Sequence, residues 1–107
     1  MIIDIVESIH GYPIRLTEER WYDHIVNNKP YMSGHLQDVL DAVYYPEFIL
    51  LGNKGSKAAL LNLGYKQWLH VFYIEYVNED GNKDGFIITA LIKANYDRKK
   101  IVWRRDS

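Results

Sequence analysis

The residues best suited to chemistry in this sequence are an arginine and a histidine four positions apart, Arg20 and His24. An imidazole titrates near neutral pH, so His24 could act as a general acid or base. On a helix the spacing of four places Arg20 on the same side, where its guanidinium could hold a phosphate. Later in the chain, Thr89 and Lys93 interrupt an apolar run with a hydroxyl and an ammonium group. These four candidate catalytic residues predict metal-independent acid–base chemistry on a phosphate.

Each of these residues also has a purely structural interpretation. His24 could be a surface residue of a helix that bonds to Asp23 or to a carbonyl, and polar positions at a sheet edge would explain Thr89 and Lys93 equally well. His35 could supply a second imidazole, although the Ser-Gly-His segment that contains it is also typical of the start of a helix. Both interpretations stay open at this point.

The motifs of cofactor and metal enzymes are missing from the sequence. It contains no phosphate-binding glycine loop, no dinucleotide fingerprint and no zincin motif, and its histidines lack metal-ligand spacing. It also has no cysteine, so we expect no disulfide, no metal and no cofactor, and a reducing, cytoplasmic setting. The N-terminus does not resemble a secretory signal, and no apolar run approaches the roughly 20 residues of a membrane span. We therefore expect no contact with a membrane.

Basic residues gather at the C-terminal end of the chain. The formal net charge is −1, yet from residue 93 onward six Lys and Arg face two Asp, which gives this end +4 and leaves −5 for residues 1–92. Such a basic end could bind the phosphates of RNA, although a solvated, fraying terminus is an equal alternative. With the cationic, imidazole and aromatic residues elsewhere, the predicted RNA-binding set is Lys29, His35, Tyr73, Arg98, Lys99 and Lys100.

The periodicity predicts two helices followed by strands. A helix is expected over residues 18–28, after the hydroxyl cap of Thr17, and a second helix between Ser33 and Pro46. The later strands are expected at residues 48–51, 57–64, 67–77, 85–93 and 101–103, after short extended pieces at 2–7 and 14–16. We therefore predict a single α+β domain over residues 1–107, with both helices on one face of a curved antiparallel sheet of about four strands.

Two segments also carry a family resemblance. The first covers residues 14–51, with the pattern Arg15-Leu16-Thr17-x-x-Arg20-Trp21-x-x-His24-Ile25, Lys29-Pro30-x-Met32, a Leu/Val-rich helix and Pro46-Glu47-x-Ile49; the second is Gly85-Phe86-Ile87-Ile88-Thr89-Ala90. Together they resemble phage nucleases of the barnase, EndoU, colicin and RelE-like (BECR) superfamily. The resemblance implies two helices on a strongly curved antiparallel sheet and a small metal-independent ribonuclease.

The resemblance also implies roles for individual residues. His24 matches the histidine of the first helix, Arg20 the basic position one turn before it, and Thr89 the hydroxyl of the late strand. Lys29 stands where the family commonly has a second histidine, and Lys93 lies beyond the matched strand. The family implies a toxin of a toxin–antitoxin or phage-conflict system.

The resulting hypothesis is an endoribonuclease that promotes attack of the RNA 2′-hydroxyl on the adjacent phosphate. His24 would be the acid or base, Arg20 and Lys93 would stabilise the developing charge, and Thr89 would bond a phosphate oxygen. The expected partners are RNA and a proteinaceous antitoxin, and a homo-oligomer is compatible with the sequence. The alternative is a non-catalytic module of the same fold that binds a protein or RNA, for which Lys29 at the histidine position is an argument.

Overall fold

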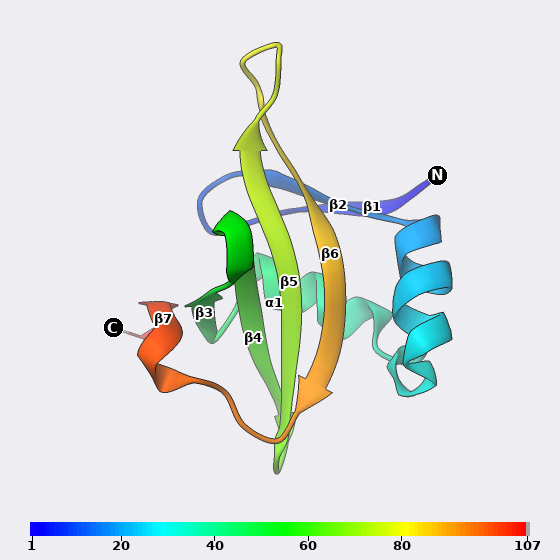
Figure 1. The fold of residues 1–107 in the computed structure, drawn as a ribbon, viewed down its shortest axis with the longest axis vertical. Helices are drawn as coiled ribbons and strands as arrows, with labels where there is room; N and C mark the ends of the chain where they lie inside the picture. Colours follow the sequence, from blue (N-terminus) through cyan, green and yellow to red (C-terminus); the bar gives the residue numbers. More distant parts are fainter. Residues whose placement is uncertain (107) are drawn as a thin grey trace.

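A seven-stranded mixed sheet forms most of the molecule, with the strand order β1-β2-β6-β5-β4-β3-β7 (Figure 1). The structure is a computed structural model, which describes residues 1–106. The strands are β1 (Ile2–Glu7), β2 (Pro13–Thr17), β3 (Phe48–Leu51), β4 (Lys57–Gly64), β5 (Gln67–Val77), β6 (Lys83–Lys93) and β7 (Ile101–Arg104).

Two helices cover one face of this sheet. A π-helix, η1 (Glu19–Val26), lies beside β6, and α1 (Leu36–Tyr44) lies behind the sheet in Figure 1. Three short 3-10 turns complete the chain: η2 (Pro30–Met32), η3 (Asn53–Gly55) and η4 (Arg98–Lys100). The inner sides of η1 and α1 pack on the sheet through Trp21, Ile25, Val39 and Val43, all of which are buried. Burial of these apolar side chains supplies the main stabilisation of the fold.

The prediction of two helices on an antiparallel sheet of about four strands is wrong. The sheet has seven strands, two of them precede the first helix, and β2 runs parallel to β6 where Arg15 pairs with Phe86. The reason is that the short N-terminal segments bury Ile14 and Leu16 completely in the main core. Local periodicity reveals that such a segment is extended, but not which distant strand it joins.

The hairpin of β5 and β6 is the centre of the sheet and agrees with the sequence prediction. The two strands pair antiparallel from Trp68 opposite Lys93 to Val77 opposite Lys83. The register shifts once, because Thr89 is opposite Phe72 while the next paired residue on β6 is Ile87. This β-bulge inserts one extra residue into β6 and changes which side its neighbours face.

Alternation along β5 gives the sheet two different faces. Leu69, Val71 and Tyr73 point to the closed face, which η1 and α1 cover. The alternate residues Trp68, His70 and Phe72 point to the open face, which is toward the viewer in Figure 1. Neither η1 nor α1 covers this open face.

The C-terminal segment covers one end of the open face. Tyr96 packs edge-on against Trp68, with ring centroids 4.7 Å apart, and tilted against Phe48 at 5.2 Å. Ile101 joins the same small cluster, and β7 continues the sheet beyond β3. The segment after β6 therefore crosses the open face and closes its lower end in Figure 1.

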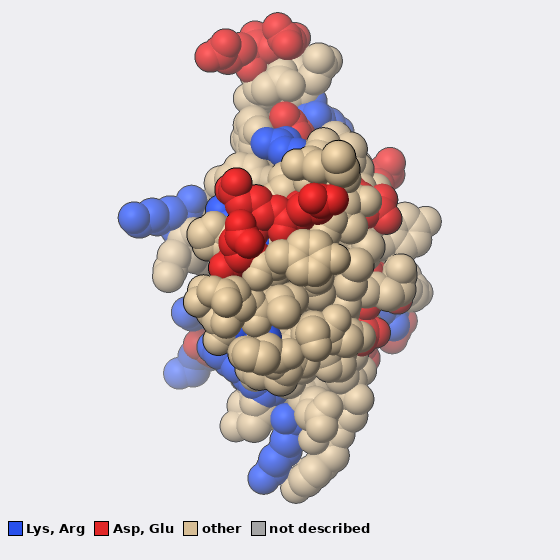
Figure 2. Space-filling view, turned by 90° about the vertical axis from the view of Figure 1, so that its right-hand side faces the viewer, with Lys and Arg blue, Asp and Glu red and all other residues tan. Residues whose placement is uncertain are grey.

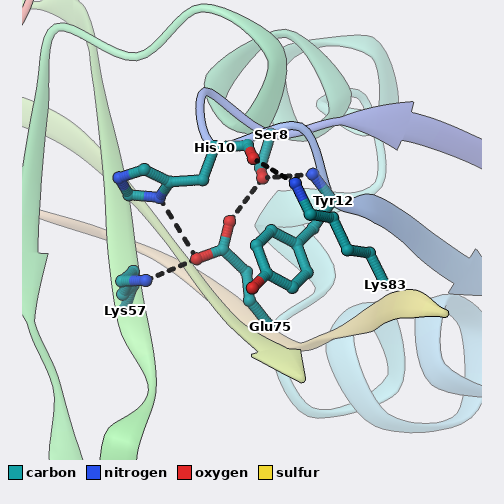
Figure 3. Close-up of polar contacts among 6 residues, drawn as sticks. All are labelled: Ser8, His10, Tyr12, Lys57, Glu75 and Lys83. Atoms are coloured by element: carbon teal, nitrogen blue, oxygen red, sulfur yellow. Dashed lines mark hydrogen bonds and ion pairs between the residues drawn. The ribbon is translucent and has the colours of Figure 1, made fainter. Parts of the chain in front are cut away.

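A buried carboxylate ties the first hairpin to the rest of the sheet (Figure 3). The side chain of Glu75 is only 4 % exposed, and it accepts hydrogen bonds from Ser8 Oγ and Lys57 Nζ, with His10 Nδ1 at 3.3 Å. Ser8 Oγ in turn accepts a bond from the backbone N–H of Tyr12 at 3.2 Å. Burial raises the pKa of Glu75, but the bonds from Lys57 and Ser8 and the charges of Lys57 and His10 outweigh it, so the net pKa lies below the ordinary value of 4.5.

This network makes the fold sensitive to acid. A carboxyl whose pKa is lowered on folding stabilises the protein above its unfolded pKa, and that contribution is lost as the pH falls through the folded pKa. We expect Glu75→Gln to lower the free energy of unfolding by about 2 kcal/mol at pH 7 and to flatten its decrease between pH 6 and 3, measured by urea unfolding. Glu79→Gln, at the hairpin tip, is the control and should change neither quantity. An unchanged acid dependence in Glu75→Gln would contradict this role.

Candidate functional site

Two adjoining hollows occupy the open face. The first, the His70 hollow, has a volume of about 490 Å³ and includes His70, Phe72, Lys93, Tyr96 and Lys100 in its lining. The second, the apolar hollow, has a volume of about 510 Å³ and is lined by Phe72, Ile74, Ile88 and Leu91, with polar groups of Asn53, Lys54, Ser56 and Thr89 at its edges. Phe72 and Asn53 belong to both hollows, so the two are continuous.

The His70 hollow holds an imidazole whose tautomer is determined by the backbone. Nδ1 of His70 lies 3.0 Å from the carbonyl oxygen of Trp68. A carbonyl oxygen only accepts, so Nδ1 carries the proton and, in the neutral ring, Nε2 is an acceptor. Burial lowers the pKa of His70; the bond to Trp68 opposes this change, and the charge of Lys93 adds to it. His70 is therefore a neutral base at pH 7, beside ammonium groups.

Lysines stand around both hollows. Lys93 and Lys100 line the His70 hollow, and Lys54 lines the apolar hollow. On the opposite side of the apolar hollow, Lys29 Nζ donates a hydrogen bond to Thr89 Oγ1 at 3.4 Å. Among the described residues, none of these four lysines forms an ion pair with a carboxylate. The open face therefore combines an apolar floor with four lysines that form no ion pair, although Asp97 also lines the His70 hollow.

The structure brings together four of the predicted site residues. Thr89 lines the apolar hollow, Lys93 and Lys100 line the His70 hollow, and Lys29 reaches the same face through its bond to Thr89. Arg98 and Lys99 are exposed in η4, next to this group, where Asp97 Oδ1 accepts a bond from the Lys99 N–H. The late strand and the basic C-terminal end thus contribute to one surface.

His24 and Arg20 are not part of this surface. His24 is exposed on η1 and lines neither hollow, and Arg20 lines a separate hollow of about 220 Å³ with Arg15 and Phe86. In Figure 2, which faces the η1 side, acidic side chains gather in the upper half, while Lys and Arg lie mainly along the left margin, toward the open face. The structure therefore separates the predicted imidazole from Lys93, and places His70 beside Lys93 instead.

The two remaining predicted residues lie away from the open face. His35 precedes α1, where its Nδ1 lies 2.9 Å from Oδ2 of Asp38. Tyr73 is completely buried in the closed-face core, and its hydroxyl is the only enclosed side-chain polar atom without a hydrogen-bond partner among residues 1–106. Burial, with the negative charge of Glu75, raises its pKa above the ordinary value. Tyr73 is therefore a core residue in this structure and does not reach the surface.

No protein-family model, no curated protein and no solved structure matches the chain. The resemblance to the BECR nucleases thus gains no support from these comparisons, and the function has to be argued from the site. Within the described part of the chain, no three or more His, Asp or Glu side chains gather as metal ligands. None of the helices described has both the length and the apolar character needed to cross a bilayer.

Sequence reasoning treated His70 as a packing residue on the other face of its strand and gave it no chemical role, although a signal for its place beside Lys93 was present. His70 lies between the buried residues Leu69 and Val71, and strand alternation places it on the face opposite to theirs. The paired strand brings Lys93 to that same face, two positions beyond Leu91, which is the partner of His70. Alignment of the two strand patterns would have placed the imidazole and the ammonium group together.

The environment of His70 predicts its titration. We expect its imidazole, followed by NMR, to titrate below the ordinary value of 6.5. Lys93→Gln should raise this pKa because it removes a positive charge, while burial still holds it below 6.5. Lys83→Gln, at the far end of β6, is the control and should leave it unchanged. Titration of His70 at or above 6.5 would contradict the geometry described here.

Proposed function

We propose that the open face binds unpaired RNA. The observation that carries the proposal is the combination of the half-buried Phe72 and Tyr96 rings with Lys93 and Lys100 in one hollow, next to the enclosed ring of His70, which is 3 % exposed. Rings on an exposed sheet face are general platforms for unstacked bases, and lysines beside them neutralise the phosphates. Specific base recognition is not required for either contact.

The polar groups of the hollow favour RNA over DNA. Nε2 of neutral His70 is an acceptor, and the lining of the same hollow includes Asn53, Asn95 and Asp97, whose side chains contain acceptor oxygens. A ribose 2′-hydroxyl can donate to such acceptors, whereas deoxyribose has no donor at that position. A deoxyribose oligonucleotide of the same sequence is therefore expected to bind more weakly.

The lysines of the His70 hollow give the binding a defined salt dependence. We expect Lys93→Gln with Lys100→Gln to weaken binding to an unstructured RNA at least tenfold, and to reduce the slope of log K against log salt by about 1.4, since each phosphate contact on a single strand contributes about 0.7. The measurement is fluorescence anisotropy with a labelled oligouridine at several salt concentrations.

The matched control removes two lysines outside both hollows. Lys66→Asn with Lys83→Gln changes the net charge equally, and Asn accepts the left-handed backbone at position 66. Equal weakening by both pairs would show nonspecific attraction and contradict a site on the open face. Absence of RNA binding, with capture of an acidic protein by this face, would favour the protein-interaction module instead.

We propose RNA cleavage as a second candidate function of the same hollow. Nε2 of His70 would take the proton of the 2′-hydroxyl, the 2′-oxygen would attack the phosphorus, and the bond to the 5′-oxygen would break. Lys93 and Lys100 would stabilise the charge of the phosphorane, and an ammonium group or water would protonate the leaving oxygen. Uncontrolled cleavage of this kind arrests growth, so the proposal extends to a toxin that a protein antitoxin neutralises.

Two histidine variants decide which imidazole, if either, acts in cleavage. With RNA and a chelator, we expect fragments that end in a 2′,3′-cyclic phosphate, formed about 10² to 10⁴ times more slowly by His70→Gln. His24→Gln should retain the full rate, because His24 lines neither hollow. Thermal unfolding of both variants checks their folding. Loss of cleavage only in His24→Gln would return the role to η1, and no fragments from the unmodified protein would exclude cleavage.

A further inference from the structure

Phe72 divides the open face into two compartments of similar volume. Its ring lines both hollows, and the loop around η3 borders both through Asn53. The ring of His70 lies nearly parallel to that of Phe72, with 6.2 Å between centroids and 25° between planes. Because His70 is only 3 % exposed, its ring supports that of Phe72 and does not offer a second stacking surface. A base in either hollow would border the ring of Phe72, and aromatic rings on a sheet face are platforms for bases. The two compartments therefore match two neighbouring bases.

A strained lysine stands at the side of this divide. Lys54 has φ 53° and ψ 40°, a left-handed conformation that favours glycine or asparagine, and the next residue, Gly55, also has a positive φ. The Lys54 side chain lines the apolar hollow, next to the shared residue Asn53. Lys66 has the same left-handed conformation outside both hollows, so the position of Lys54 beside the apolar hollow, and not the strain itself, points to its ammonium group.

Both ends of the open face are closed. At the lower end, Tyr96 packs on Trp68. At the upper end, Arg15 is bound to Asp84 at 2.5 Å and to the hydroxyl of Tyr76 at 3.3 Å. The His70 hollow and the apolar hollow lie between these limits.

We propose that the open face takes two consecutive unpaired nucleotides, one base in each hollow on either side of Phe72, and that Lys54 contacts the phosphate that joins them. This inference rests on the proposed RNA binding and adds the length of the ligand and the role of Lys54. Lys29, bonded to Thr89, and Lys93 are then placed near the outer phosphates, one beside each hollow.

The length of the ligand is tested with uridine 3′-monophosphate and with oligouridines of two, three and four nucleotides, titrated by NMR against the whole chain. Their integrity is checked after each titration. We expect affinity to rise at least tenfold from one nucleotide to two, and less than threefold from two to four. Equal affinity for one and two nucleotides, or a steady rise up to four, would overturn the inference while leaving RNA binding intact. Absence of binding by all four probes would overturn both.

Lys54→Gly tests the role of the bridging lysine, and Lys66→Gly is its matched control. Lys66 is the other lysine with a positive φ, 54°, but it lies in the β4–β5 turn and lines neither hollow. Both variants relieve the same strain, so neither should lower the melting temperature. We expect Lys54→Gly to weaken dinucleotide binding about tenfold with mononucleotide binding unchanged, and Lys66→Gly to change neither. Equal weakening of both ligands by Lys54→Gly, or no weakening, would overturn the assignment.

Discussion

The strict alternation of side chains along β5 is the constraint on which the other features depend. Leu69, Val71 and Tyr73 are completely buried under the helices, so the residues between them have to face the other way. A slip of one residue would turn His70 toward the main core and Val71 toward the open face. The antiparallel pairing with β6 then brings Lys93 and Thr89 to the open face. Core packing on one side of the sheet thus determines which chemical groups meet on the other side.

Much of the secondary structure could be predicted from the sequence, but its assembly could not. The β5–β6 hairpin follows from two aromatic and β-branched runs around a polar turn, which is a local signal. The mixed character of the sheet depends on a parallel contact between Arg15 and Phe86, which are far apart in the chain. The identity of a distant partner depends on the whole core, so short patterns could not show that the N-terminal hairpin joins β6.

The candidate site was also predictable only in part, because local patterns identify unusual residues but do not show which face they share. Thr89 and Lys93 stood out as polar residues in an apolar strand, and both line the open face. Simple alternation would place Ile87 and Thr89 on one face, but the extra residue Ile88 at the bulge leaves Ile87 in the closed-face core. His24 was selected by helical spacing with Arg20, but spacing says nothing about which side of a helix packs on the sheet. Tyr73 was assigned without a known face, and alternation buries it.

The open face has lysines beside its hollows although the chain has a net charge of −1. Glu75 forms an ion pair with Lys57 on the closed side, and Asp84 forms one with Arg15 at the upper end of the open face. No carboxylate among residues 1–106 pairs with Lys93 or Lys100. A sheet face that is covered by another protein segment rarely has lysines beside its apolar hollows, because the covering segment would remove water from their charged groups. A ligand that is anionic and has flat apolar groups would complement the lysines beside Phe72, and the unpaired RNA strand proposed above has both properties.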